Sequence, residues 1–347
     1  MHHLPTVTFM QLYRIPQAAG IDSLTIAETH IPQPERGQAL VHMHAASLNY
    51  RDLMIVEGRG ARGAPPADLV PLSDGSGVVI AVGPDVTRVK PGDRVAGCFM
   101  QSWVGGPLGL EDGASALGGA VDGVLAEYRL FDQNGLVLLP DHLTFEQGAA
   151  LPCAGVTAWN ALYGGQPLSP GDTVLVLGTG GVSVFALQFA AAAGFRVIAT
   201  SSSDEKLEVM HRLGATHGVN YRQHPEWQDQ VLALTGGEGV ARVVEVGGTG
   251  TLTRSIQATR LGGEIGMIGA LTQGGEINPT PAMRKGLILR GIYVGSRQMF
   301  EAMNRAISAH RIEPVIDRVF KFEEAADAYR HLKSQTHLGK VVIRIAE

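Results

Sequence analysis

The middle third of the chain repeats one rhythm: a short apolar segment rich in valine and isoleucine, a glycine-containing turn, and a stretch of helical length. Each apolar segment has the length and the bounding turn residues of a buried strand. Strands that alternate with helices in this way form an α/β fold, with helices on both faces of a doubly wound parallel sheet. Six strands are predicted, over residues 173–177, 195–200, 217–221, 241–246, 264–269 and 288–294.

A Gly-Thr-Gly-Gly-Val turn directly follows the first of these strands and opens an apolar helix. The pyrophosphate of a dinucleotide must approach the backbone closely, beside the free N–H groups of a helix N-terminus, and glycine permits that approach. Ser183 stands where the third glycine of the usual pattern would fall, and it is small enough to keep the helix close to the strand. The alternative is an ordinary tight turn between a strand and a helix. The predicted cofactor-binding residues of this turn are Gly178, Gly180, Gly181 and Val182.

The end of the second strand bears on the choice between NAD and NADP. NAD sites usually place Asp or Glu there, to bind the ribose 2′-hydroxyl. This strand instead ends in Ser201 and Ser202, with Lys206 about one helical turn later. Hydroxyl and ammonium groups would bind a 2′-phosphate that a carboxylate would repel, so NADPH is the predicted cofactor. Tyr221, at the end of the third strand, is a candidate for stacking on the adenosine side.

The same serine run can begin a helix. Ser202 is a candidate N-cap for a helix predicted near residues 203–213, with Glu205 completing a capping box. Gly214 would end that helix in the left-handed conformation. The two roles are compatible, because a cap at Ser202 leaves Lys206 for the phosphate.

The two ends of the chain differ from the middle. Residues 1–150 hold short strands between Pro- and Gly-rich turns, which predicts a mainly antiparallel β domain. A final apolar strand over 340–345, after two helical segments, is expected to join the sheet of that domain. The Gly- and Ala-rich segment 99–121 is predicted to be a long loop. The strands of the first domain are predicted over 39–46, 77–82, 93–96 and 124–130. The predicted domains are 1–153 with 296–347, and 154–295.

Composition excludes several classes of protein. A net charge of −5 gives no electrostatic reason to expect nucleic acid or an anionic membrane as partner. The longest strongly apolar stretch, 182–193, is too short to span a bilayer. Cys98 and Cys153 are the only cysteines, too few for a disulfide framework. We therefore expect a soluble, cytoplasmic protein that acts on a small molecule.

Several motifs are highly specific when they are taken together. They are the glycine turn and residues 46–52, 73–77, 91–95, 151–159 and 339–342. With them the chain resembles the medium-chain dehydrogenase/reductase superfamily, in its zinc-lacking quinone oxidoreductase-like branch. The resemblance covers nearly the whole chain and implies a Rossmann cofactor-binding domain with a GroES-like catalytic domain. It also implies a homodimer that joins two Rossmann sheets, as the exposed edge strand 288–294 would favour.

The zinc alcohol dehydrogenases of this superfamily bind catalytic zinc through a Cys, a Gly-His-Glu motif and a second Cys. The resemblance puts Asn49 at the first position and Ser73 at the histidine, so that only Cys153 remains. A catalytic zinc site needs three protein ligands, and we therefore expect no metal. His42 and His44 share one face of a predicted strand and could form half a metal site. Surface or lightly packed histidines are the favoured interpretation.

Without a metal, oxidation of a simple alcohol lacks a group that stabilises the developing alkoxide. Hydride transfer to a quinone or to the β-carbon of an enone is easier, because the charge delocalises over the conjugated system. The predicted reaction is therefore NADPH-dependent reduction of quinones or enones. The alternatives are a metal-free alcohol or carbonyl reaction with NAD(P), and a cofactor-binding protein with little turnover.

The resemblance also implies a cleft between the two domains that holds the nicotinamide. The candidate catalytic residues there are Asn49, Tyr50 and Arg51, and Tyr50, Arg51 and water are the candidate proton donors. Asp52 and Asp74 are equally well explained as structural residues of turns or salt bridges. The further cofactor contacts that the resemblance implies are Asn49, Thr157, the backbone of Ile268 and Val294, Ser296 and Arg297.

Overall fold

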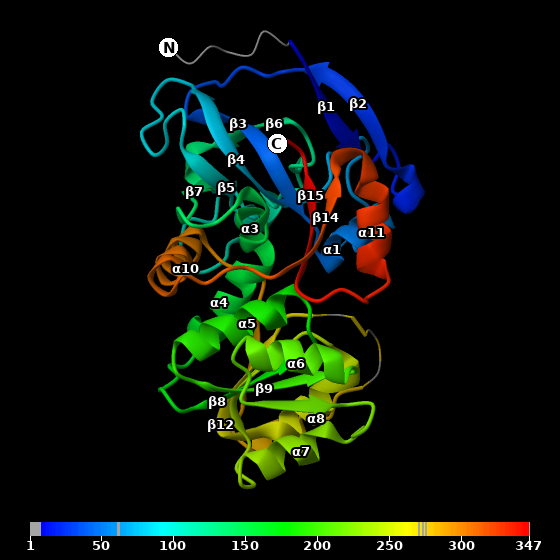
Figure 1. The fold of residues 1–347 in the computed structure, drawn as a ribbon, viewed down its shortest axis with the longest axis vertical. Coiled ribbons are helices and arrows are strands. Elements are labelled where there is room, and N and C mark those ends of the chain that lie inside the picture. The colour runs from blue at the N-terminus through cyan, green and yellow to red at the C-terminus, as the bar shows by residue number, and fades with distance from the viewer. Residues whose placement is uncertain (1–7, 61–62, 270, 273, 275, 347) are drawn as a thin grey trace. The chain divides into compact units, whose positions relative to one another are not determined.

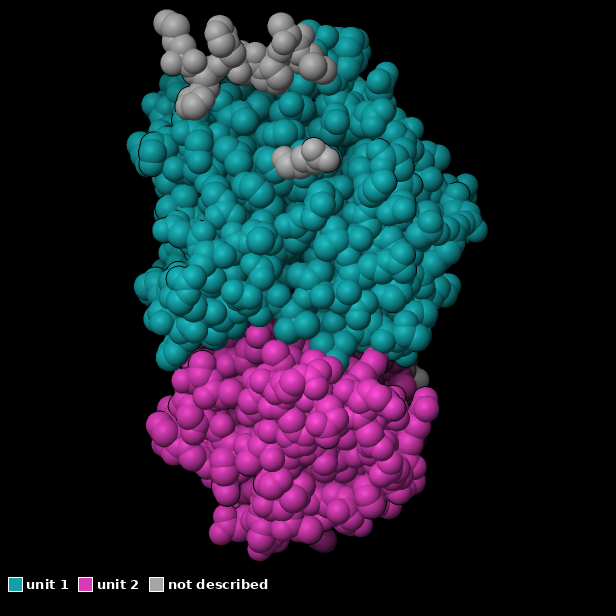
Figure 2. All heavy atoms as spheres, viewed as in Figure 1, with its two compact units in different colours: residues 1–156, 295–347 teal, residues 157–294 magenta. Residues whose placement is uncertain are grey.

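The structure is a computed structural model that describes residues 8–60, 63–269, 271–272, 274 and 276–346. The chain divides into two units, which Figure 2 colours separately. The first comprises the residues up to Val156 together with Gly295–Glu347, and the second is Thr157–Val294. The sequence boundaries were expected at 153/154 and 295/296.

The second unit contains the predicted doubly wound sheet (Figure 1). Its strand order is β10-β9-β8-β11-β12-β13, and every pairing is parallel. The chain reverses its direction of travel across the sheet between β10 and β11, so β8 and β11 flank the switch point where such sheets bind ligands at their carboxyl ends. The strands are β8 (Thr173–Leu177), β9 (Arg196–Ser201), β10 (His217–Asn220), β11 (Val240–Glu245), β12 (Thr259–Met267) and β13 (Ile288–Gly291).

The helices of this region begin and end where the sequence supplies caps. The residue that caps α6 is Ser203, whose hydroxyl accepts the N–H of Lys206, and not Ser202 as predicted. The reason is that β9 continues to Ser201, so the helix begins one position later. Gly214 has a φ of 112°, as expected for the end of this helix. The helices are α4 (Val156–Tyr163), α5 (Gly181–Ala192), α6 (Asp204–Arg212), α7 (Trp227–Leu234), α8 (Thr249–Ala258) and α9 (Thr280–Arg284).

The first unit is built on a mainly antiparallel sheet with the order β14-β15-β3-β4-β5-β7, to which β6 is added beside β3. The C-terminal strand β15 pairs antiparallel with β3, as predicted, and parallel with β14. A separate pair of strands, β1 and β2, precedes this sheet in the chain. The strands are β1 (Phe9–Arg14), β2 (Thr25–His30), β3 (Gln38–Ser47), β4 (Asp74–Val82), β5 (Arg94–Gly97), β6 (Tyr128–Asp132), β7 (Leu136–Leu138), β14 (Ile316–Lys321) and β15 (Lys340–Arg344).

Two predictions for this unit need correction. The strand predicted over 124–130 is β6, which starts only at Tyr128, because the N–H of Val124 bonds to carbonyls of the loop at Pro71 and Leu72. The segment 99–121 is mostly irregular, as predicted, but it contains a short helix, α2 (Leu110–Ala114). The other α-helices of the unit are α1 (Tyr50–Val56), α3 (Phe145–Ala149), α10 (Arg297–His310) and α11 (Ala325–Lys333). Among the described residues, no helix has the length and apolar character needed to cross a membrane.

Candidate functional site

The glycine turn after β8 has the geometry that phosphate binding requires. Gly178 has a left-handed backbone (φ 71°), and its N–H donates to Oγ1 of Thr200 on the neighbouring strand at 3.2 Å. Gly180 is the N-cap of α5, which begins with Gly181 and Val182. A Cβ atom built on Gly180 would meet no other described atom within 4 Å, so open space adjoins the helix N-terminus. That space and the unpaired N–H groups of the first turn suit a pyrophosphate.

Ser183, which stands in place of the third glycine, forms a hydrogen bond between helix and strand. Its buried hydroxyl donates a hydrogen bond to the carbonyl of Leu177 at 2.6 Å. This bond joins the first turn of α5 to the last residue of β8. The serine therefore fixes the helix N-terminus relative to the strand, which is the purpose that the third glycine serves by close packing.

The residues predicted to bind a 2′-phosphate lie at and beyond the end of β9. Ser201 is buried, and its Oγ accepts the N–H of Ser203 at 3.2 Å. Ser202 and Lys206 are partly exposed, and Tyr221 is 41% exposed after the end of β10. Ser201 therefore helps to shape the start of α6, while the other three side chains are accessible to a ligand.

Asp204 is an acidic residue at this end of the sheet that the sequence reasoning did not consider. Its Oδ1 accepts a hydrogen bond from Nδ2 of Asn220 at 2.7 Å, and its Oδ2 accepts one from Nε2 of Gln223 at 2.8 Å. Both carboxylate oxygens are therefore engaged with amides at and just beyond the end of β10. Its place just after the serine run could have drawn attention to it. Asp204 is also the first residue of α6, where an acidic side chain is common for structural reasons.

A buried ion pair lies at the core of the first unit. The side chain of Lys340, at the start of β15, is 4% exposed. Its Nζ donates to the carbonyl of Leu48 at 2.6 Å and to Oδ1 of Asn49 at 2.5 Å, and it lies 3.9 Å from Oδ2 of Asp74. Sequence reasoning missed Lys340, although a lysine within an apolar terminal strand is unusual enough to indicate a buried partner.

Asp74 is fully buried and is held from two further sides. Its Oδ1 accepts the hydroxyl of Ser73 at 2.7 Å, and its Oδ2 accepts the N–H of Cys153 at 3.0 Å. Burial raises the pKa of Asp74, and Lys340 opposes that rise. Burial also raises the pKa of the Cys153 thiol, and the neighbouring Asp74 raises it further. These residues thus form a compact polar cluster at the start of β4.

The three candidate catalytic residues stand at the start of α1 in different environments. The N–H of Asn49 donates to Oδ2 of Asp52 at 2.7 Å, and Tyr50 is 36% exposed. The guanidinium of Arg51 donates to the carbonyl of Leu117 at 3.0 Å and also lies 3.4 Å from Oδ1 of Asp52. Burial raises the pKa of Asp52 to about 6, although Arg51 opposes the shift. Among the three, Tyr50 is the most exposed.

Three of the residues expected to meet the nicotinamide end of the cofactor lie in the second unit. In the second unit, Thr157 is buried on α4, and the N–H of Ile268 donates to the carbonyl of Glu245 at 2.8 Å. Val294 has a left-handed backbone (φ 56°), which also explains why β13 ends at Gly291 and not at 294 as predicted. Within the described part of the chain, the N–H of Val294 donates no hydrogen bond.

Two further predicted contacts have structural partners inside the first unit. Ser296 is the N-cap of α10, and its Oγ accepts the N–H of Met299 at 3.3 Å. Arg297 donates to the carbonyl of Asn134 at 2.9 Å, and its Nε lies 3.5 Å from a carboxylate oxygen of Glu301. Ser296 and Arg297 therefore both have partners within the first unit. Their contact with cofactor phosphate or ribose stays a prediction.

Comparisons with known proteins agree with this architecture. Residues 181–309 match a family model described as zinc-binding dehydrogenase, and residues 35–141 match the alcohol dehydrogenase GroES-like domain. A zinc-type alcohol dehydrogenase-like protein of Schizosaccharomyces pombe is 45% identical over 339 residues, which cover 95% of this chain and 97% of that protein. The chain belongs to the medium-chain dehydrogenase/reductase superfamily. As a member it is an NAD(P)-dependent oxidoreductase that acts on a small-molecule substrate.

The comparisons identify the superfamily, but they do not assign the chain to one branch of it. A solved structure of a putative alcohol dehydrogenase from Sinorhizobium meliloti 1021 shares 40% identity and a TM-score of 0.91, covering 98% of this chain and 100% of that one. Quinone oxidoreductase of Rattus norvegicus is 28% identical over 96% of this chain and 97% of its own length. The resemblance to the quinone oxidoreductase branch is therefore distant, and the relatives with higher identity carry names of alcohol dehydrogenases.

The resemblance matches Asn49, Ser73 and Cys153 to the zinc ligands of other superfamily members, and the first two side chains have partners within the protein. Oδ1 of Asn49 accepts the Lys340 ammonium, and the Ser73 hydroxyl donates to Asp74. Of the three residues, only Cys153 has a side chain of a type that zinc commonly binds. Across the described residues, no group of three or more His, Cys, Asp and Glu side chains is arranged to hold a metal ion.

His42 and His44 are packed among aromatic rings. The ring of His42 stacks on Tyr128 with centroids 4.8 Å apart, and that of His44 stacks on Phe145 at 4.2 Å. Burial lowers the pKa of both histidines. The sequence favoured surface or lightly packed histidines over half of a metal site, and the structure places both rings half-buried against aromatic side chains.

Proposed function

We propose that this chain is a zinc-independent, NADPH-dependent reductase that transfers hydride to quinones or to the β-carbon of enones. The observation that carries the proposal is the Lys340 ammonium bound to Asn49 and paired with Asp74, where zinc-dependent relatives have ligands. An ammonium group at this position repels a zinc ion, and it already binds the amide oxygen of Asn49. A conjugated acceptor suits a metal-free site, because its developing charge is delocalised and hydrogen bonds can stabilise it.

The proposed preference for NADPH depends on the end of β9. The strand ends in a serine, and the partly exposed Ser202 and Lys206 follow it. The first carboxylate beyond the strand, Asp204, has both oxygens engaged by Asn220 and Gln223. Hydroxyl and ammonium groups at this position favour a 2′-phosphate over a bare ribose hydroxyl.

When NADPH is bound, it supplies the hydride, and the residues of the chain bind and orient it. The glycine turn would hold the pyrophosphate, while Thr157 and the backbone N–H of Val294 would meet the nicotinamide end. An enone that receives hydride at its β-carbon takes up a proton at its α-carbon. Tyr50 and water are the proton sources favoured here, because Arg51 is engaged with the Leu117 carbonyl and packs 4.6 Å over a phenylalanine ring.

The test is a steady-state assay of the purified chain with NADPH and with NADH, against a quinone, an enone, an aldehyde and a secondary alcohol. We expect turnover of the quinone or enone with NADPH. Lys206→Ala should raise the KM for NADPH and leave that for NADH unchanged, while Lys333→Ala in the first unit serves as the control. A preference for NADH would refute the cofactor assignment, and turnover of the alcohol alone would refute the substrate assignment.

A second candidate reaction is favoured by the names of the relatives. The proteins with the higher identities are called alcohol dehydrogenases or alcohol dehydrogenase-like, which supports alcohol or carbonyl chemistry with NAD(P). The aldehyde and alcohol arms of the same assay decide between the two reactions. A chain that binds NADPH tightly without turning over any acceptor would instead be a cofactor-binding protein.

A further inference from the structure

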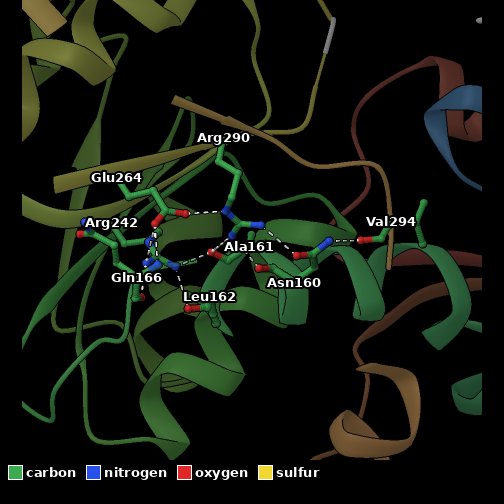
Figure 3. Close-up of polar contacts among 8 residues, drawn as sticks. All are labelled: Asn160, Ala161, Leu162, Gln166, Arg242, Glu264, Arg290 and Val294. Carbon is green, nitrogen blue, oxygen red and sulfur yellow. Dashed lines mark hydrogen bonds and ion pairs between the residues drawn. The ribbon is translucent and has the colours of Figure 1, made fainter. Parts of the chain in front are cut away.

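Two arginines of the parallel sheet bind the carboxyl end of α4, as Figure 3 shows. Arg242 on β11 donates from Nη1 to the carbonyls of Ala161 and Leu162, both at 2.7 Å. Arg290 on β13 donates from Nη2 to the carbonyl of Asn160 at 2.8 Å. The last carbonyls of a helix have no partner within it and carry the negative end of its dipole. The guanidinium groups therefore cap the helix and fix its position on the sheet.

Glu264 joins the two arginines into one buried network. Its side chain is 1% exposed, and its Oε2 accepts from Nη2 of Arg242 at 3.1 Å while its Oε1 accepts from Nε of Arg290 at 2.7 Å. The N–H of Gln166 also donates to Oε2 at 2.8 Å. A Cβ atom at Gly165 would lie 2.1 Å from Oε1, so any larger residue there would displace the Glu264 carboxylate. Buried charges of this kind hold a single geometry when every partner is present.

The network ends at the side chain of Asn160, which lies between Arg290 and Val294 in Figure 3. Its Oδ1 accepts from Nη1 of Arg290 at 2.9 Å, and its Nδ2 donates to the carbonyl of Val294 at 2.7 Å. Because arginine only donates and a carbonyl only accepts, the two partners determine which way the amide is oriented.

Val294 requires such support. A left-handed backbone is uncommon for a β-branched residue and persists only where its surroundings impose it. The Asn160 amide holds the carbonyl of Val294, while the N–H of Val294 has no acceptor among the described residues. Thr157 lies three positions before Asn160 on α4, so both project from the same side of that helix.

We infer that Asn160 is a positioning residue for the nicotinamide end of the cofactor. Its hydrogen bond to the Val294 carbonyl fixes the backbone of Val294, so that the N–H of the same residue is directed at the carboxamide oxygen. Arg290, Glu264 and Arg242 hold the amide of Asn160 in the orientation that makes this possible. This role rests on the proposed function, since it requires a nicotinamide cofactor.

The test compares NADPH with 2′-phospho-ADP-ribose, which is NADPH without its nicotinamide. Asn160→Asp keeps an acceptor for Arg290 and replaces the donor to Val294 with a carboxylate oxygen that repels the carbonyl. Arg290 can pair with the added charge, so the fold should survive. We expect the affinity of this variant for NADPH to fall about tenfold and its affinity for 2′-phospho-ADP-ribose to stay within about twofold. The fluorescence of bound NADPH should change as well, because it reports on the surroundings of the nicotinamide. Calorimetric titration and fluorescence are the measurements.

The control is Thr235→Ala, which removes a hydrogen bond to the carbonyl of Val231 before β11 begins, away from the carboxyl ends of the strands. We expect it to change neither affinity. An equal loss of both affinities in Asn160→Asp would reduce the residue to a structural role, and unchanged affinities would remove it from the cofactor site. If the unmodified chain binds neither ligand, the proposed function fails together with this inference.

Discussion

The ammonium group of Lys340 lies 2.5 Å from Oδ1 of Asn49, which precedes it by 291 positions in the sequence. The contact joins the first residue of β15 to the N-cap of α1. The same ammonium lies 3.9 Å from Oδ2 of the fully buried Asp74. One side chain therefore contributes to the stability of the first unit and to the orientation of a candidate catalytic residue.

Replacement of Lys340 tests the first of these roles. In Lys340→Met the Asp74 carboxylate loses its counter-charge inside the core, and loss of one partner of a buried pair costs about 3–5 kcal/mol. We expect the free energy of unfolding in urea to fall by that amount. Lys333→Met is the control, because its side chain is 60% exposed beside Glu57 and such a pair contributes at most about 1 kcal/mol. Equal losses in the two variants would contradict the prediction.

Asp52 predicts a dependence of stability on pH. Its pKa is raised to about 6 in the fold, above about 3.9 for an unfolded chain. Between those values the folded state binds more protons than the unfolded state, so this group's contribution to the free energy of unfolding decreases as pH rises. The contribution is complete at low pH and is lost above about pH 6.

Asp52→Asn removes the titrating group and keeps an acceptor for the N–H of Asn49. We expect the variant to gain stability relative to the unmodified chain as pH rises from about 4 to 8, by about 3 kcal/mol over the interval. Urea unfolding of both proteins at several pH values measures the difference. A difference that stays constant over that range would show that Asp52 does not titrate as described.

The parallel sheet could be predicted from the sequence because each of its strands is marked locally. β8 was predicted to the residue, and the order of the six strands follows the predicted doubly wound pattern. The errors were confined to the ends of strands, because contacts with distant parts of the chain determine where a strand stops. β13 stops at Gly291 because Val294 adopts a left-handed backbone that its sequence does not favour.

The first unit and the buried networks were harder to predict. β1, β2, β7 and β14 were missed. Lys340 and Asn160 were missed as well, because their partners are 291 and 134 positions away and no local pattern joins them. The glycine turn and the serine run could be found because their chemistry depends on neighbours in the sequence.

Zinc-independence is open to direct measurement. The donors at the matching positions are Asn49, Ser73 and Cys153, and the first of them binds an ammonium group. We expect elemental analysis of the purified chain to find no stoichiometric zinc, and we expect EDTA to leave its activity intact. A zinc-dependent alcohol dehydrogenase treated in parallel is the control. Activity that EDTA abolishes and zinc restores would overturn the proposal.

A homodimer through β13 is the expected assembly. β13 is at one edge of the six-stranded sheet, and Ile288 and Leu289 are each 37% exposed there. An apolar edge strand invites pairing with a second copy. We expect light scattering at micromolar concentration to give a dimer, which Leu289→Lys should convert into a monomer. Leu261→Lys, at a residue 75% exposed outside β13, should leave the dimer unchanged. A monomeric unmodified chain would refute the assignment.

Gly180→Val tests the glycine turn itself. The φ of Gly180 is −76°, which any residue can adopt, whereas Gly178 has a left-handed φ of 71°. A side chain at Gly180 meets no other described atom within 4 Å and would therefore occupy the space in front of α5 without disturbing the fold. There it would exclude the pyrophosphate. Lost hydrogen bonds to charged phosphate oxygens are worth about 1.5–3 kcal/mol each, so the affinity for NADPH should fall at least about tenfold.

Gly178→Val is the matched comparison for Gly180→Val. It forces a β-branched residue into the left-handed region and should lower the melting temperature of the cofactor-free chain, whereas Gly180→Val should not. The measurements are thermal melts of both variants and titration with NADPH. The decisive result is the melting temperature of Gly180→Val taken together with its affinity for NADPH. An unchanged melt with an unchanged affinity would mean that the pyrophosphate binds elsewhere, and a lowered melt would mean that the open space in front of α5 is needed by the fold itself.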